Sequence, residues 1–472
     1  MPVYNTLPPE LQDKYNNVVG SFGLDDLDMY ARDIRLSWKA YLICLVTIFI
    51  CIFLWNLMLN TFAEVLAWIS IFLVGVGMLA LGFCVKYYAD SNYPEDDTTG
   101  KWLNRGAIAI WSLTGIYVLA VLCSYTAIKI SVKVLRVSAR VIMSNMRMII
   151  VPVVGIFAIV VWILFFAYSL LWLMSCGDMK QNQLTSPTGT ILGTYVTYVW
   201  TDQEKYYMWA SLFYFLWVTA FSLAATQFVL IVAVASWYFT SNSDRRGDFS
   251  IMRGYYWLWR YNLGSILIGS FLIAVIWFIR IVFEYVNQKL QNGGDNALAS
   301  AAKCVQNGVR CCLDCCNRFI KYINDTAYCQ IALTGENFCN AAINGMLLTL
   351  KHAATFTFAR GIGGIFNLLG KLAVTVTNCL LGYACIVMLP QLEIEVNSPI
   401  GPLIIIAMFS YCIATIFMSM YTTTTLCLLH SLYADVDICQ QKSYDEMVGM
   451  NRPREMNTLV GDMSGSKQPF LS

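Results

Sequence analysis

Residues 149–175 read IIVPVVGIFAIVVWILFFAYSLLWLMS, an apolar run that contains no Asp, Glu, Lys or Arg. About 20 apolar residues in a helix span the roughly 30 Å hydrocarbon core of a bilayer. A soluble domain has no comparable place for such a run, because its surface must remain largely wet. The stretch therefore predicts a transmembrane helix.

The composition of the whole chain supports the same class of protein. Of its 472 residues, 58% are hydrophobic and 13% are charged, and the net charge is +2. Ordinary soluble chains carry roughly 25% charged residues, so a soluble enzyme, a disordered protein and a secreted disulfide scaffold are all excluded. A net charge this small argues against a nucleic-acid partner. Long continuous runs, rather than alternating segments of about ten residues, exclude a β-barrel. We therefore expect an all-α, polytopic transmembrane helical bundle.

Several other runs are long enough to cross a bilayer. They are 41–59, 62–86, 107–126, 207–236, 263–287, 362–389 and 400–430. A further stretch, 320–350, is less continuous, because Asn324, Asp325, Glu336 and Asn337 interrupt it. It is either a poor span or a broken, re-entrant helix, which is tolerated only against protein or a water-filled cavity.

One segment is basic rather than apolar. Residues 129–147 contain no acid, and their bases are Lys129, Lys133, Arg136, Arg140 and Arg147. The first four follow one another at steps of four, three and four, so a helix places them on one face, opposite an apolar face. We expect an amphipathic helix that lies at the cytosolic membrane interface.

Lys and Arg in short loops indicate the orientation of the bundle. The basic segments 129–147 and 237–262 are expected inside, and the segments 87–106 and 176–205 outside. Counting crossings from these segments predicts about nine spans and a non-cytosolic N-terminus. The expected organisation is a polar N-terminal segment at 1–40, a transmembrane domain at 41–430 and a polar cytosolic C-terminal tail at 431–472.

The motifs of enzymes and metal sites are not evident. The cluster Cys311, Cys312, Cys315 and Cys316 allows a zinc or disulfide interpretation, but adjacent Cys pairs lack the usual spacing of a metal site. Helix packing or S-acylation fits it better. His352 and His430 have no nucleophile nearby in the sequence. We therefore expect no enzyme activity, no metal and no cofactor.

Five short phrases occur in order along the second half of the chain. They are ASWYF at 235–239, RYNLGS at 260–265, FIKYIN at 319–324, GENFC at 335–339 and LGKL at 369–372. In this order and spacing they resemble the choline transporter-like family (solute carrier family 44). With DIRLSW at 33–38 and VLAW at 65–68, the resemblance covers about residues 33–435.

The resemblance implies ten spans, with a large extracellular loop between the first two. Residues 33–38 resemble the end of that loop, so the chain is expected to be a divergent member that lacks the first span and most of the loop. Nine spans then remain, which agrees with the count from loop charges. The family usually has His where Asn262 stands, and Gly near Glu64.

The function implied by the resemblance is transport of choline or a related organic cation by alternating access. The alternative is a non-transporting structural or accessory subunit of a membrane complex, suggested by the lost span and the altered polar positions. Expected partners are a quaternary ammonium compound, membrane lipids and other membrane subunits, without nucleic acid. The expected location is the plasma membrane, or else an organelle membrane.

A site for choline needs aromatic faces and diffuse negative charge, because a quaternary ammonium has no N–H to donate. A cation–π contact contributes about 0.5–2 kcal/mol, and a carboxylate or amide inside a span is costly unless it has a partner. The candidate substrate-binding residues on these grounds are Trp55, Glu64, Trp68, Tyr117, Trp162, Tyr214, Trp217 and Gln227. Membrane-interface anchoring is the alternative role for the aromatic residues, and helix–helix hydrogen bonding is the alternative for Gln227.

Overall fold

The computed structural model describes most of the chain between residues 32 and 460. The described ranges are 32–92, 98–185, 191–240, 250–291, 296–388, 398–441, 452–453, 456–457 and 459–460. Most of the predicted N-terminal segment 1–40 and much of the predicted tail 431–472 lie outside these ranges.

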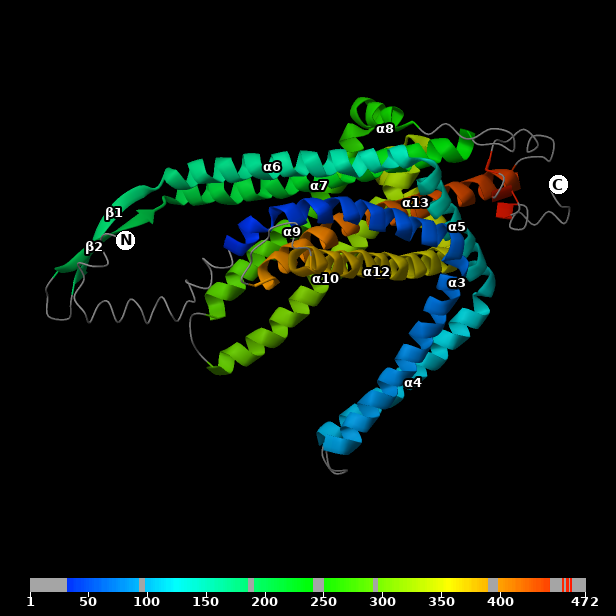
Figure 1. The fold of residues 1–472 in the computed structure, drawn as a ribbon, viewed down its shortest axis with the longest axis horizontal. Helices are drawn as coiled ribbons and strands as arrows, with labels where there is room; N and C mark the ends of the chain where they lie inside the picture. The colour runs from blue at the N-terminus through cyan, green and yellow to red at the C-terminus, as the bar shows by residue number, and fades with distance from the viewer. Residues whose placement is uncertain are drawn as a thin grey trace. The chain divides into compact units, whose positions relative to one another are not determined.

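The chain divides into two compact units. Unit 1 comprises Met1–Met143 and Ala359–Thr422, and unit 2 comprises Ser144–Phe358 and Thr423–Ser472. Both are built from helices, which confirms the predicted all-α bundle (Figure 1). Within the described ranges, seven helical segments are long and apolar enough to cross a membrane. They are Trp38–Asn92, Thr98–Cys123, Arg147–Ser175, Asp202–Thr240, Ile251–Lys289, Ala353–Val387 and Ile400–Cys439.

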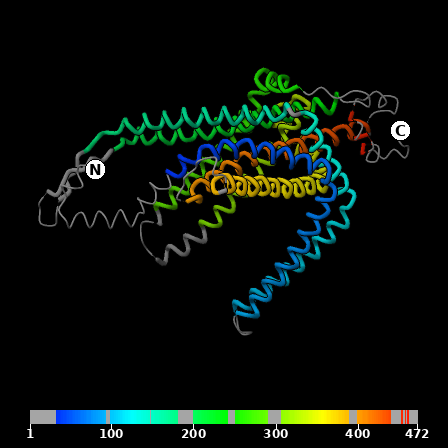
Figure 2. Tube along the Cα trace, in the orientation of Figure 1, coloured from blue at the N-terminus to red at the C-terminus, as the bar shows by residue number. Residues whose placement is uncertain are grey.

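Helix α3 (Trp38–Asn92) joins the two predicted runs 41–59 and 62–86 in one continuous helix. Its 55 residues correspond to a length of roughly 80 Å, more than twice the hydrocarbon core. The tube of α3 changes direction part-way along (Figure 2). Within α3 the side chains of Asn56 and Thr61 donate hydrogen bonds to the carbonyls of Ile52 and Leu57, a type of contact that often bends helices.

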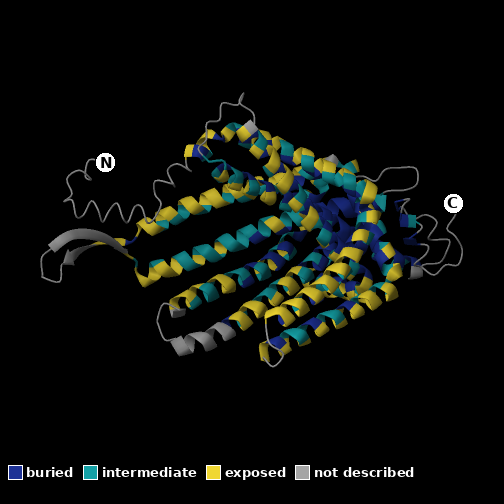
Figure 3. Cartoon of the chain, turned by 60° about the horizontal axis from the view of Figure 1, so that its bottom comes forward, coloured by how far each residue is buried: buried dark blue, intermediate teal, exposed yellow. Residues whose placement is uncertain are grey.

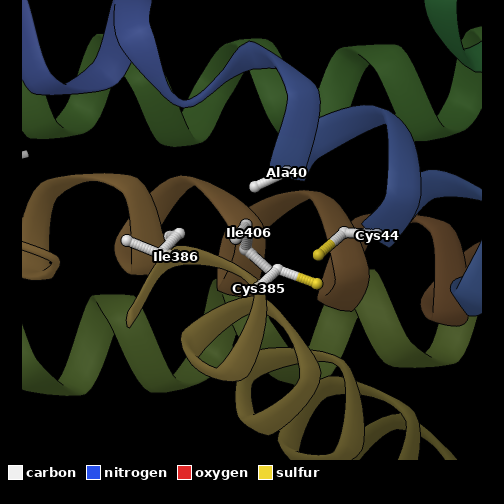
Figure 4. Close-up of a cluster of buried hydrophobic side chains, with 5 residues drawn as sticks. All are labelled: Ala40, Cys44, Cys385, Ile386 and Ile406. Carbon is white, nitrogen blue, oxygen red and sulfur yellow. The ribbon is translucent and has the colours of Figure 1, made fainter. Parts of the chain in front are cut away.

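The core of unit 1 forms where α3 meets α12 (Ala353–Tyr383), η4 (Ala384–Met388, a π-helix) and α13 (Ile400–Gln441). Ala40, Cys44, Cys385, Ile386 and Ile406 pack together there (Figure 4). Small side chains at this place let the helices approach closely, as is usual in membrane bundles.

A buried polar chain lies one turn away from that core. The hydroxyl of Thr47 donates to Asn378 Oδ1 at 2.5 Å, and Asn378 Nδ2 donates to the hydroxyl of Ser410 at 2.6 Å. Asn378 and Ser410 are both 0% exposed. The adjoining cavity measures about 90 Å³ and is lined mainly by apolar residues. This chain of hydrogen bonds ties α3, α12 and α13 together.

Helix α5 (Tyr125–Ser144) is the predicted amphipathic helix. It follows α4 (Thr98–Cys123), which packs beside α3. Lys129, Arg136 and Arg140 are exposed, whereas the apolar face is buried. Its position at the membrane interface stays a prediction.

A β-hairpin interrupts the helices between α6 (Ile150–Ser175) and α7 (Asp202–Thr240). Strand β1 (Asp178–Thr185) pairs antiparallel with β2 (Ile191–Val199). The sequence analysis treated 176–205 only as an outer loop and did not predict this hairpin. Trp200 closes its base by donating from Nε1 to the carbonyl of Met174 at 3.2 Å.

Apolar side chains remain exposed along the span-capable helices (Figure 3). On α6, for example, Phe157 is 70% exposed, Leu164 65% and Leu171 68%. Exposed apolar surface of this extent is unfavourable in water but suits contact with lipid.

The irregular stretch 320–350 is a broken helix, one of the two predicted forms. Helix α10 (Asn296–Thr334) ends at Gly335, which has a positive φ of 73°, and α11 (Phe338–Lys351) follows. The two helices pack closely against each other. A Cβ at Gly345 would lie 2.8 Å from the carbonyl oxygen of Thr326, so only glycine fits at this crossing.

We expect Gly345→Ala to destabilise unit 2, because the added methyl group meets backbone that cannot move aside. Overpacking of this kind costs about 1–3 kcal/mol. Thermal unfolding in detergent should show a lower midpoint. Gly308→Ala in α10 is the control, since nothing lies within 4 Å of a Cβ there. Equal midpoints for both variants would contradict the close approach of α10 and α11.

Candidate functional site

A group of polar side chains lies where α7, α9 (Leu263–Gln291) and α10 meet in unit 2. Gln227 of α7 donates from Nε2 to Asp325 Oδ1 of α10 at 2.8 Å. Asn324 Nδ2 donates to the carbonyl oxygen of Gly269 in α9 at 2.7 Å. We call Gln227, Asn324, Asp325 and Tyr328 the α10 polar cluster.

Two oxygen atoms of the α10 polar cluster are buried without a hydrogen-bond partner. They are Asn324 Oδ1 and the Tyr328 hydroxyl, and both residues are only 1% exposed. A buried polar atom without a partner costs about 1–3 kcal/mol. In native proteins such atoms usually have a partner, which can be water or a ligand. The α10 polar cluster therefore has hydrogen-bonding capacity that the protein itself does not use.

The cluster also places a carboxylate deep among apolar helices. Asp325 is partly buried and accepts a hydrogen bond from Gln227 of α7, while its neighbour Asn324 bonds to Gly269 of α9. Both α7 and α9 are long and apolar enough to span a membrane. An ionised carboxylate at membrane depth costs about 2.5–3.5 kcal/mol or more. A carboxylate at this position attracts a positive charge that comes near it.

Aromatic rings line the contact between α7 and α9. Three on α7 meet three on α9, with ring centroids 5.3–6.1 Å apart and mainly edge-to-face geometry. The six are Trp209, Phe213, Trp217, Phe271, Phe278 and Tyr285. Such contacts stabilise helix packing, and the same ring faces can bind a quaternary ammonium when they are exposed.

The candidate residues predicted in unit 2 lie in three places. Gln227 is part of the α10 polar cluster, and Trp217 is part of the aromatic contact, with its Nε1 donating to the carbonyl of Leu267 at 3.4 Å. Trp162 and Tyr214 meet edge to face at 5.5 Å. They pack α6 against α7, and Trp162 Nε1 donates to the carbonyl of Phe215.

The candidate residues predicted in unit 1 take part in separate helix contacts. Trp55 lies against Gly370 of α12, and Trp68 packs on Tyr125 at 5.6 Å. Tyr117 donates its hydroxyl hydrogen to the carbonyl of Ile71 at 3.1 Å. The carboxylate of Glu64 is 61% exposed and lies 3.9 Å from Arg136. Within unit 1 the structure does not gather these four around one cavity.

The sequence analysis named Asp325 only as an interruption of an apolar stretch. Its neighbour Asn324 also begins the sequon Asn324-Asp325-Thr326. The structure places Asn324 inside α10, nearly fully buried, so its amide is inaccessible to glycosylation. The useful signal was the carboxylate within an otherwise apolar stretch, combined with the Gln227 amide inside another span.

The structure also places the cysteine cluster and His352. The four clustered cysteines, Cys311 to Cys316, are exposed on α10, and the described residues contain no group of His, Cys, Asp or Glu able to hold a metal. His352 stacks on Tyr433 at 3.8 Å. Burial lowers the pKa of His352 from its usual 6.5, so its imidazole is neutral at pH 7.

Comparison with known proteins agrees with this architecture. The family described as plasma-membrane choline transporter matches residues 108–437, which is more than half of the chain. This protein belongs to the choline transporter family. The match includes every member of the α10 polar cluster and the whole of α5.

Relatives with choline transporter names are distant but align over most of the chain. Choline transporter-like protein 1 of Xenopus laevis is 26% identical over 391 residues, which cover 80% of this chain and 57% of that protein. The protein of the same name in Caenorhabditis elegans is 27% identical over 443 residues, which cover 84% of this chain and 56% of that protein. Choline transporter protein 1 of Arabidopsis thaliana is 26% identical, covering 83% and 60%. The chain thus spans little more than half the length of these relatives.

Two features of the structure lie near the ends of predicted spans. Asn262, where the resemblance led us to expect His, ends a π-helix, η3 (Leu258–Asn262), and donates to the carbonyl of Trp257 at 3.2 Å. Helix α13 continues to Gln441, beyond the predicted span end at 430. In the following segment, Met456, Leu459 and Val460 are 0–3% exposed.

A buried ion pair anchors that C-terminal segment to unit 2. Arg452 lies 3.3 Å from Asp435 of α13, and the two side chains are 7% and 3% exposed. Tyr238 of α7 donates to Asp435 Oδ2 at 3.0 Å, and Arg452 donates to Cys439 Sγ at 3.2 Å. The cluster has a partner for each charge, which is the condition for burying an ion pair without a large penalty.

We expect Arg452→Gln to destabilise the protein by about 3–5 kcal/mol, because Asp435 would remain buried without its cation. The measurements are thermal unfolding in detergent and the rate of maleimide labelling at Cys439, which is 4% exposed and should become reactive. Arg280→Gln is the control, since it breaks an exposed pair with Asp314 that contributes about 1 kcal/mol or less. Slow labelling of Cys439 in Arg452→Gln would show that Arg452 does not hold the segment in place.

Proposed function

We propose that this protein carries choline or a related organic cation across a membrane by alternating access, and that Asp325 balances the positive charge of the substrate. The observation that carries the proposal is the Gln227–Asp325 hydrogen bond, which places a carboxylate of α10 beside the span-capable helix α7. Gln227 donates one hydrogen bond to this carboxylate. The family match, and the word choline in the names of the relatives, support choline as the first substrate to test.

The chemistry of the α10 polar cluster suits such a substrate. A quaternary ammonium has no N–H and a diffuse charge, so it is bound by a carboxylate at moderate distance and by aromatic faces. Asp325 supplies the charge, and Trp217 is the nearest predicted aromatic group along α7. Of the predicted site residues, we therefore propose Trp217 and Gln227 as parts of the substrate path. The others, Trp55, Glu64, Trp68, Tyr117, Trp162 and Tyr214, take packing or surface roles.

We further propose nine crossings of the membrane. The long helix α3 would supply two of them on either side of its bend, and the broken pair α10–α11 would supply one. The six other span-capable segments complete the number. Breaks and π-turns are common where transporter helices bind substrate or bend. Gly335 and η3 are such places in unit 2. The plasma membrane is the proposed location.

We expect Asp325→Asn to lower saturable choline uptake into reconstituted vesicles by about tenfold to a hundredfold. The reason is that interactions with a charged partner contribute about 1.5–3 kcal/mol. The control is Asp314→Asn on the same helix, which removes the same charge from an exposed pair with Arg280 and should transport normally. Folding is checked by matched elution and unfolding midpoints.

Two results would count against the proposal in different ways. Full uptake by Asp325→Asn would show that Asp325 does not bind the substrate, but it would not contradict the proposal that the protein is a transporter. Absence of saturable uptake by the unaltered protein, together with its recovery in a stable larger assembly, would favour the accessory-subunit alternative.

A further inference from the structure

The apolar face of helix α5 is packed against other parts of the protein. Val134, Leu135 and Ala139 are all 0% exposed. The side chain of Leu135 lies near Gly363 of α12, and its carbonyl oxygen accepts a hydrogen bond from the Tyr421 hydroxyl of α13 at 2.9 Å. An amphipathic helix usually binds a membrane by sinking its apolar face into the lipid. In α5 that face is already buried against protein, so this mode of binding is not open to it.

The opposite face of α5 is a row of bases. Lys129, Arg136 and Arg140 are exposed and Lys133 is half-buried, and the helix contains no Asp or Glu. Arg136 lies 3.9 Å from Glu64, and both side chains are exposed. A pair of this kind is weak. Lys129, Lys133 and Arg136 therefore give this face of the helix a net positive charge.

The connections of α5 hold this row at the surface of the bilayer. Span-capable α4 ends at Cys123 and α5 begins at Tyr125, while the next span-capable segment begins at Arg147, just after α5 ends at Ser144. Both ends of α5 are thus tied to helices that cross the membrane. The anions that are always within reach of such a helix are the headgroups of acidic lipids.

We propose that the basic row of α5 binds the headgroups of anionic lipids such as phosphatidylserine. Lys129, Lys133 and Arg136 contact the phosphate and carboxylate groups, while Leu135 on the buried face attaches α5 to unit 1. The helix then binds charged headgroups at the membrane surface without inserting into the lipid. Binding is electrostatic, so it weakens as salt screens the charges.

The test compares lipid retention by variants in nanodiscs made of phosphatidylcholine and phosphatidylserine in equal amounts. Native mass spectrometry of the released protein gives the ratio of retained phosphatidylserine to phosphatidylcholine. A base near an anionic surface contributes about fivefold to binding. We therefore expect Lys129→Gln with Lys133→Gln to lower that ratio by about ten- to thirtyfold, and added salt to lower the ratio of the unaltered protein.

The matched control is Lys101→Gln with Arg105→Gln in α4. This pair has the same charge and the same spacing of four residues, and both side chains are exposed. The α4 pair should keep the lipid preference of the unaltered protein. If both double variants lose the preference for phosphatidylserine equally, the preference depends on the net charge of the protein and not on α5. If the α5 variant keeps the preference, α5 is not the lipid-binding site. Either result overturns the proposal. Binding of a soluble polyanion such as heparin, without any preference of the protein for phosphatidylserine over phosphatidylcholine, would also overturn it. Unfolding midpoints in phosphatidylcholine alone confirm that all variants are folded.

Discussion

A polar group among apolar helices must find its partner in the protein or in a bound molecule, because the surrounding hydrocarbon offers none. This constraint explains the interior of both units. In unit 1, Asn378 receives a hydrogen bond from Thr47 and donates one to Ser410. In unit 2, Asp325 accepts from Gln227. Each contact joins different helices, so the few polar side chains of the interior also determine which helices meet.

The two interior clusters differ in how completely they are satisfied. The Thr47–Asn378–Ser410 chain uses both the oxygen and the nitrogen of the Asn378 amide, and it adjoins only a small, mainly apolar cavity. Its role is structural. In the α10 polar cluster, Asn324 Oδ1 and the Tyr328 hydroxyl are left without partners beside a carboxylate. These unpartnered oxygen atoms are the reason for proposing that the α10 polar cluster binds a ligand.

Breaks in regular helix occur close to these polar groups. Gly335, with its positive φ, separates α10 from α11 beyond the cluster. The π-helix η3 precedes the part of α9 that contacts Asn324, and η4 contributes Cys385 and Ile386 to the core of unit 1. A π-turn leaves backbone groups less regularly paired than an α-helix does and is frequent at functional sites. The chain thus concentrates its irregular backbone where its helices carry polar or closely packed contacts.

Local patterns in the sequence determined much of the architecture. Apolar runs identified the span-capable helices, the spacing of Lys129, Lys133, Arg136 and Arg140 identified the amphipathic helix, and the polar residues of 320–350 indicated a broken one. These features depend on hydropathy and helical periodicity, which are determined by residues close together in the sequence. The continuity of α3 and the β1–β2 hairpin were missed, because hydrogen bonding across a bend and the pairing of two short strands leave weak traces in hydropathy.

Only the tertiary structure decided which polar groups meet. Gln227 and Asp325 are 98 residues apart, and the sequence alone could identify each as costly but could not pair them. Likewise, the tail residue Arg452 is buried against Asp435, although its own surroundings in the sequence are polar. Such contacts depend on how whole helices pack, since burial and partner choice are properties of the folded arrangement and not of any single segment.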